Sequence, residues 1–119
     1  DLDIGGNCIK VFATHLSTKT RERPKQMEFI AKKIQESQGP NILMGDFNST
    51  PFSEEMKKLF DIINDTAMEE YNTFPANQPE ARVDYILVSD IFNIVSNKYI
   101  ESSASDHLPV VAEVILNSY

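Results

Sequence analysis

The most informative segment of the sequence is a short apolar run that ends in glycine and polar residues, NILMGDFN at residues 41–48. The run from Asn41 to Met44, apolar after its first residue, is too short for a helix and predicts a buried strand. The residues from Gly45 to Pro51 are turn-forming types and predict a loop. Asp46 therefore lies just past a buried strand, where a carboxylate is costly unless it is paired or bound to metal.

A strand and a helix are predicted before this segment. Residues 8–16 alternate between apolar and polar types, with His15 on the apolar parity, and this pattern predicts a strand. Gly5-Gly6-Asn7 predicts a hairpin turn from an earlier short strand. Pro24 suits a first helical turn, and the apolar spacing after it predicts a helix that ends at Gly39-Pro40.

The segments after residue 48 complete an α/β pattern. Ser53 is a suitable N-cap for a short second helix, and residues 61–80 are predicted to be irregular. Three strands are predicted after them, over residues 83–88, 91–100 and 109–116. The order β-α-β-α-β-β-β is typical of layered α/β proteins.

Composition excludes some classes of function. The net charge is −7, and residues 61–119 contain two basic residues against ten acidic ones. Non-specific nucleic-acid binding depends on neutralising phosphates, so this chain is poorly suited to it. The basic cluster from Lys19 to Lys33 is interpreted as a solvated helix face. No apolar run approaches the length of a membrane span, and the lone Cys8 cannot form an internal disulfide.

Polar residues at strand edges are the candidate site residues. Asp84 interrupts an apolar strand, and Asp106 and His107 directly precede another. Each acid taken alone is better explained as a turn former or as a satisfied core acid. The occurrence of Asp46, Asp84, Asp106 and His107 at strand edges in three separate segments favours a functional site. A calcium loop starting at Asp46 is excluded, because its sixth position would be proline and its twelfth lysine.

Four short motifs occur in order along the chain: Thr14-His15-Leu16, Gly45-Asp46-Phe47-Asn48, Arg82-Val83-Asp84-Tyr85-Ile86-Leu87 and Ser105-Asp106-His107-Leu108-Pro109-Val110. In their order and approximate spacing they resemble the C-terminal half of the endonuclease/exonuclease/phosphatase family, which has the deoxyribonuclease-I-like fold. The motifs Arg23-x-x-Gln26 and Thr73-Phe74-Pro75 resemble bacterial metal-dependent hydrolases of this family. The resemblance covers most of the chain, from Ile9 to Leu116.

The resemblance implies a fold and a domain assignment. The expected class is α/β, the C-terminal half of a four-layer α/β/β/α sandwich, with a mixed, mostly antiparallel sheet and helices on one face. Residues 1–119 are expected to form a single partial domain whose N-terminal half is absent. The chain does not begin with Met and has no signal-peptide pattern, and we expect it to be a piece of a longer protein, so its compartment stays open.

The resemblance also implies catalytic roles. His15 would hydrogen-bond a phosphate oxygen or act as an acid, and the alternative is a surface histidine. Asp46 would orient or deprotonate the attacking water, and Asn48 would hold a phosphoryl oxygen unless it is only a turn residue. His107 would pair with Asp84, which fixes its tautomer. The alternative for Asp84 is an ion pair with Arg82, and we favour the pairing with His107.

A divalent ion, Mg²⁺ or else Mn²⁺ or Ca²⁺, is the implied cofactor, with Asp106 and Asp46 as ligands. The implied substrates are a phosphorylated small molecule, a phospholipid headgroup or a nucleic-acid phosphodiester. Gly45 is expected to be structural, Phe47 and Tyr85 to pack in the core, and Arg23 to lie at the surface.

The family's N-terminal half supplies an Asn and a metal-binding Glu that this chain lacks. We therefore expect little hydrolase activity from the chain alone. A competing hypothesis is a non-catalytic binding module that docks a partner through its open sheet face, where apolar side chains would otherwise be exposed.

Overall fold

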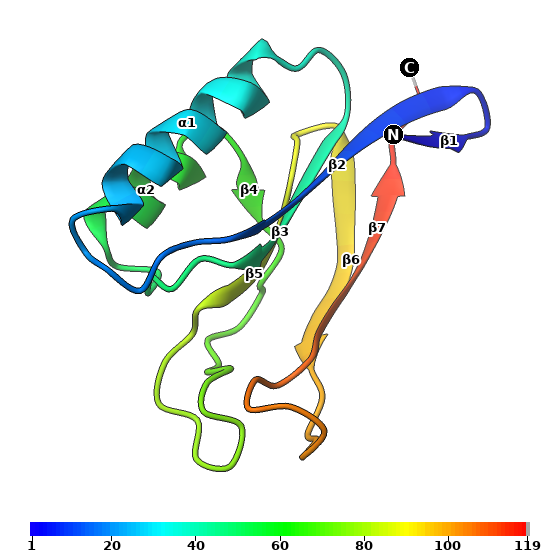
Figure 1. The fold of residues 1–119 in the computed structure, drawn as a ribbon. Coiled ribbons are helices and arrows are strands. Elements are labelled where there is room, and N and C mark those ends of the chain that lie inside the picture. Colours follow the sequence, from blue (N-terminus) through cyan, green and yellow to red (C-terminus); the bar gives the residue numbers. More distant parts are fainter. Residues whose placement is uncertain (119) are drawn as a thin grey trace.

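The computed structural model describes residues 1–118 and shows three layers (Figure 1). Two helices form one outer layer, a five-stranded sheet lies in the middle, and a two-stranded sheet covers part of its other face. The elements in chain order are β1 (Leu2–Ile4), β2 (Asn7–His15), α1 (Arg23–Glu36), β3 (Asn41–Asp46), α2 (Glu54–Phe60), β4 (Asn64–Asp65), β5 (Asp84–Val88), β6 (Phe92–Tyr99) and β7 (Val110–Leu116).

The main sheet has the strand order β1-β2-β3-β5-β4. β1 and β2 form an antiparallel hairpin through the predicted turn at Gly5 and Gly6. β2 and β3 are parallel because α1 connects them, whereas β3 pairs with β5 and β5 with β4 in antiparallel fashion. The predicted α/β class, with a mixed, mostly antiparallel sheet and helices on one face, is confirmed.

The helices pack on one face of the main sheet. Ser53 caps α2 as predicted, since its side chain accepts a hydrogen bond from the backbone N–H of Met56. Leu43 and Leu87 project from the sheet toward the helices and are almost completely buried. Each such side chain contributes about 1.5–3 kcal/mol through its removal from water. The cluster consists of Leu16, Met27, Ile34, Leu43, Phe47, Met56, Leu59, Ile63, Tyr85 and Leu87.

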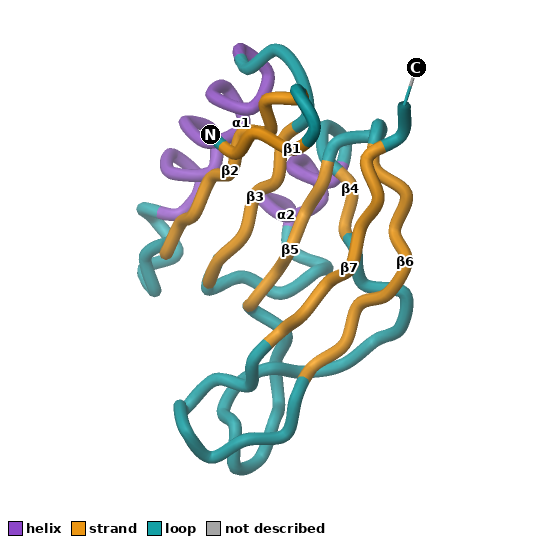
Figure 2. Tube along the Cα trace, turned by 90° about the vertical axis from the view of Figure 1, so that its right-hand side faces the viewer, coloured by secondary structure: helices purple, strands orange, loops and turns teal. Residues whose placement is uncertain are grey.

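The second sheet, β6 and β7, covers the part of the other face that lies near β5 (Figure 2). A smaller buried cluster of Ile9, Val88 and Phe92 joins the two sheets. The contact is partial, because Val11 on the same face of β2 is 37% exposed. On the outer side of β7, Ile115 is 55% exposed. Apolar side chains are thus exposed on the uncovered part of the main sheet and on the outer side of the second sheet.

Two predictions about the secondary structure were wrong. Gly45 and Asp46 belong to β3 and not to the following loop, since they pair with β2 on one side and β5 on the other. The segment 61–80 is not wholly irregular, because Asn64–Asp65 form β4. In residues 1–118, neither helix is both long and apolar enough to cross a lipid bilayer.

Candidate active site

Three of the predicted site residues form a row across adjacent strands. His15 of β2 pairs in register with Asp46 of β3, and Asp46 pairs with Asp84 of β5. Residues that pair directly across strands project from the same face of a sheet. The two carboxylates and the imidazole therefore project together from the face opposite the helices. They belong to the end of the sheet where β2 and β3 lead into loops and β5 begins (Figure 1).

His107 reaches this row from the loop before β7. Its Nδ1 lies 2.8 Å from Oδ2 of Asp84, and its Nε2 lies 3.6 Å from Oδ2 of Asp46. The Nε2 of His15 is 3.4 Å from the same Asp46 oxygen, so this carboxylate lies between two imidazoles. The ring of His107 packs on Phe74 with a centroid separation of 4.6 Å, which restrains its orientation.

The surroundings of His107 favour its charged form. Burial alone lowers the pKa of this imidazole, but the hydrogen bond and charge of Asp84, together with the charges of Asp46 and Asp106, raise it above the ordinary value. A proton on Nδ1 would be donated to Asp84, and this would leave Nε2 facing Asp46 and the open side of the site. The ring is thus held where Nε2 can bind or protonate an oxyanion.

Arg82 does not pair with Asp84, which was the alternative for that acid. Both terminal nitrogens of Arg82 donate to the carboxylate of Asp65, each at 2.6 Å. The guanidinium lies over the rings of Tyr71 and Tyr85, at 5.2 and 4.5 Å from their centroids. Asp84 is therefore free of that cation and directs its carboxylate to His107.

Asn48 joins two loops at the edge of the site. Its backbone N–H donates to Oδ1 of Asp46 at 2.8 Å, and its side-chain amide donates to the carbonyl of Leu16 at 2.6 Å. It has a positive φ of 46°, a conformation that Asn tolerates better than most residues. One amide N–H and the amide oxygen are not used in these contacts. Asn48 is thus both a turn residue and a group with a donor left for a ligand.

Asp106 is the one predicted site residue that the structure places apart from the row. Its side chain is exposed, and its backbone carbonyl accepts a hydrogen bond from Ala76 at 2.7 Å. Its charge still acts on His107. Among residues 1–118, the only set of three potential metal-binding side chains is Asp46, Asp84 and His107, whose ligand atoms lie within 4.8 Å of one another. The role of Asp106 stays a prediction.

A partly buried ion pair between α1 and α2 was not anticipated. Arg23 was expected at the surface, but only 12% of its side chain is exposed, and its Nε donates to Glu55 at 2.7 Å. The same Glu55 oxygen accepts the hydroxyl of Ser49. Burial raises the pKa of Glu55. The hydrogen bonds from Arg23 and Ser49 and the charge of Arg23 together lower it by more, so the net shift is downward. The Arg23-x-x-Gln26 motif was the sequence signal for this arrangement. The side-chain oxygen of Gln26 accepts a hydrogen bond from the Ser17 N–H, and Arg23 donates to the Ser17 carbonyl.

Comparison with known proteins identifies the family. The endonuclease/exonuclease/phosphatase family matches residues 3–107. The chain belongs to this family, which includes phosphatases and nucleases and whose members generally depend on divalent metal ions. No curated protein matches the chain in sequence.

Solved structures confirm the fold. A functionally unknown conserved protein from Enterococcus faecalis V583 is 25% identical, with a TM-score of 0.79 over 90% of this chain and 50% of that chain. A mannosyl-6-phosphatase from Bacteroides thetaiotaomicron VPI-5482 is 22% identical, with a TM-score of 0.70 over 89% and 51%. A humanized TDP2 from D. rerio is 18% identical, with a TM-score of 0.78 over 95% and 57%. The chain thus spans about half the length of these structures.

Proposed function

We propose that this chain carries the phosphate-binding and acid–base side of a divalent-metal phosphoester hydrolase. The observation that supports this most directly is the 2.8 Å contact between Asp84 and His107 beside Asp46. A carboxylate that orients an imidazole, next to a second carboxylate, supplies the two proton-transfer groups that phosphoester hydrolysis uses.

Each side chain has a role that its position permits. His107, oriented by Asp84, binds or protonates a phosphoryl oxygen through Nε2. Asp46 orients the attacking water and accepts its proton. His15 is exposed at the open end of the row and donates to another phosphate oxygen. Asn48 donates its remaining amide N–H to the phosphoryl group.

The residues present fit a weakly held divalent ion. Asp46 and Asp84 are neighbours across β3 and β5, so two carboxylates project into one space. Such oxygen ligands suit Mg²⁺ or Mn²⁺, and Mg²⁺ usually retains several waters where few carboxylates are available. Asp46 is the ligand that we assign from this pair, because Asp84 is occupied by His107. Asp106, the second ligand implied by the resemblance, lies outside the group of Asp46, Asp84 and His107 and stays a prediction. When bound, the ion would polarise the phosphoryl group and stabilise charge on its oxygens.

The charge of the chain favours small substrates. The net charge is −7, and all of the excess acid lies in the half that contains Asp84, Asp106 and His107. Long nucleic acids need many cationic contacts, which this half does not offer. We therefore favour a soluble phosphorylated metabolite or a lipid headgroup as substrate.

Hydrolysis of bis(p-nitrophenyl) phosphate with Mg²⁺ tests the function. A longer protein that contains this chain with an N-terminal half-domain should hydrolyse the ester, and Asp46→Ala or His107→Ala should abolish the activity. Strong nicking of plasmid DNA in preference to small diesters would contradict the assigned substrate class. The 119-residue chain alone should show little turnover. Turnover by the pure chain that Asp46→Ala removes would contradict the requirement for a second half.

The exposed apolar side chains support a second candidate, a docking module without catalysis. Val111 and Ile115 on the outer side of β7 are 41% and 55% exposed. Sedimentation velocity separates the two functions. A tight homodimer, combined with a longer protein that shows no metal-dependent hydrolysis, would favour the docking module.

A further inference from the structure

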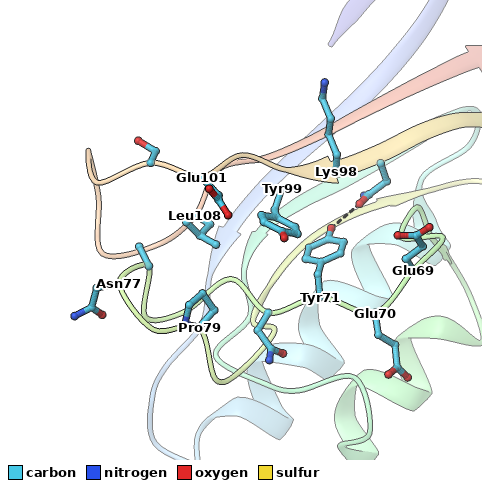
Figure 3. Close-up of a pocket in the computed structure, with 13 residues that line it drawn as sticks. Glu69, Glu70, Tyr71, Asn77, Pro79, Lys98, Tyr99, Glu101 and Leu108 are labelled. Carbon is cyan, nitrogen blue, oxygen red and sulfur yellow. Dashed lines mark hydrogen bonds between the residues drawn. The ribbon is translucent and has the colours of Figure 1, made fainter.

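A second site candidate lies beside the row described above. A cavity of about 720 Å³ opens between the segment 69–79 and the end of β6 with the loop that follows it (Figure 3). Ligand sites for small molecules occupy volumes of this order. The two walls are joined by backbone hydrogen bonds, from Ala76 N–H to Asp106 at 2.7 Å and from Leu108 N–H to Thr73 at 2.8 Å.

The centre of the cavity is a pair of tyrosine rings. Tyr71 and Tyr99 have centroids 5.4 Å apart and planes inclined by 41°. The hydroxyl of Tyr71 donates to Asn97 at 2.5 Å, and the amide of Asn97 donates to the fully buried Thr66 at 2.7 Å. This chain of hydrogen bonds fixes Tyr71 without a ligand. Tyr99 is 42% exposed, so part of its surface remains open to the cavity.

The polar groups around the rings are mainly acceptors and amides. Carboxylates of Glu69, Glu70 and Glu101 line the cavity, with amides such as Asn72. Lys98 also lines it, but its ammonium extends away from the tyrosine pair, whereas the carboxylate of Glu101 lies close to Tyr99 (Figure 3). Carboxylates accept hydrogen bonds and repel anions. The lining therefore suits a ligand rich in hydroxyl donors and excludes phosphate.

The cavity and the candidate active site meet in the chain segment before β7. Leu108 lies in the cavity wall, while the preceding residue, His107, contacts Asp84. A smaller hollow of about 340 Å³ shares Ala76 and Asn77 with the cavity and extends to Asp106. A molecule whose phosphoryl group is at His107 could thus place its organic part between the two loops.

We propose that this cavity binds a neutral, polyhydroxylated ring, such as a sugar or a cyclic polyol, as the organic part of the phosphoester. The apolar face of the ring packs on Tyr99, and neighbouring hydroxyls donate to Glu101 and to the amides. That the ring is part of a substrate rests on the proposed function. That the cavity binds such a ring does not depend on it.

Binding is tested on the 119-residue chain by two-dimensional ¹H–¹⁵N NMR, with methyl α-D-glucopyranoside and myo-inositol as probes. Both should shift the backbone amides of Tyr71, Asn97, Tyr99 and Leu108 with weak affinity. Tyr99→Ala should weaken binding roughly tenfold or more, and Tyr99→Phe should retain most of it. Phe29→Ala, on the exposed side of α1, is the matched control and should change nothing.

Two further probes separate the possible outcomes. Choline chloride tests recognition of a cation by the carboxylates and rings. Choline shifts at these amides without shifts from the hydroxylated probes would overturn the proposal, as would hydroxylated-probe shifts that Tyr99→Ala leaves unchanged. Inorganic phosphate should shift His15 and His107 but not Tyr99. Loss of the phosphate response alone would contradict the proposed function and leave the ring-binding site standing.

Discussion

The Nδ1 atom of His107 lies 2.8 Å from Oδ2 of Asp84, although the two residues are 23 positions apart in the chain. The contact connects the loop before β7 with the first residue of β5, and so joins the two sheets at the candidate site. Asp84 and the nearby Arg82 serve different partners, since Arg82 pairs with Asp65. This division of partners makes the electrostatic role of Asp84 testable by substitution.

Replacing Asp84 with Asn should lower the pKa of His107. The Asp84 carboxylate is the main group that raises this pKa, against the lowering effect of burial. The measurement is a pH titration of the His107 ring by ¹H–¹³C NMR in metal-free protein. Asp61→Asn, an exposed acid at the end of α2, is the control. An unchanged His107 titration in Asp84→Asn would show that the contact does not hold in solution.

The same shift predicts a dependence of stability on pH. A histidine whose pKa is higher in the folded state contributes stability that is complete below its unfolded value of 6.5, and this stability is lost as the pH rises through the folded value. Urea denaturation at a series of pH values above 6.5 should therefore show a decline that Asp84→Asn reduces. An equal decline in both proteins would assign the effect to other groups.

Removing Arg23 should destabilise the fold although the residue belongs to a charged surface helix. Arg23→Ala leaves Glu55 largely buried without its cation, at a cost of about 2–4 kcal/mol in the free energy of unfolding. Arg23→Lys should recover only part, because the guanidinium also donates to the carbonyls of Ser17 and Thr18. Chemical denaturation measures both. Arg21→Ala, an exposed arginine nearby, should be nearly neutral, and equal costs for Arg21→Ala and Arg23→Ala would contradict the argument.

The secondary structure and the Asp84–His107 contact were predictable because their signals are local or familiar. Apolar periodicity indicates both helices and the long strands, and Ser53 is recognisable as an N-cap. The family motifs supply the pairing of Asp84 with His107, which no spacing rule gives. Strand alternation alone does not separate Asp84 from Arg82, because residues two positions apart share a face. Arg82 instead precedes β5 and reaches Asp65 of the neighbouring β4.

The features that the sequence did not reveal depend on long-range partners. Arg23 is expected at the surface because charged residues usually are, yet its burial depends on Glu55, which lies 32 positions away. Asp65 lies in a segment without periodicity, so nothing marks it as the partner of Arg82. Asp46 is expected in a loop because Gly45 ends the apolar run, although the backbone continues as a strand.

Asn48 offers a test that separates backbone conformation from side-chain contact. Asn48→Gly removes the bond to the Leu16 carbonyl but tolerates the positive φ of 46°. Asn48→Ala removes the same bond and also adds the left-handed penalty of about 1–2 kcal/mol for a residue with a Cβ. Urea denaturation should therefore rank the alanine variant below the glycine variant. Equal stabilities would indicate that this turn relaxes to a negative φ.

Gly45 is the position where substitution should be most damaging. A Cβ at this residue would lie 1.8 Å from the carbonyl oxygen of Thr14, the neighbour across the parallel β2–β3 pair. Its φ of 147° adds strain, but the clash with backbone is the larger effect, because β2 would have to move away from β3. We expect Gly45→Ala to cost more than about 4 kcal/mol in the free energy of unfolding, or to prevent folding.

Gly39→Ala is the matched control for this substitution. Gly39 also has a positive φ, 103°, but a Cβ at this position would meet no atom within 4 Å. Gly39→Ala should therefore show only the conformational penalty, about 1–2 kcal/mol. Far-UV circular dichroism and urea denaturation of the two variants isolate the steric effect as the difference between them. Similar costs at both positions would mean that β2 and β3 do not approach closely at Thr14 and Gly45 in solution. The next pair in the same register, His15 and Asp46, would then not be held side by side either.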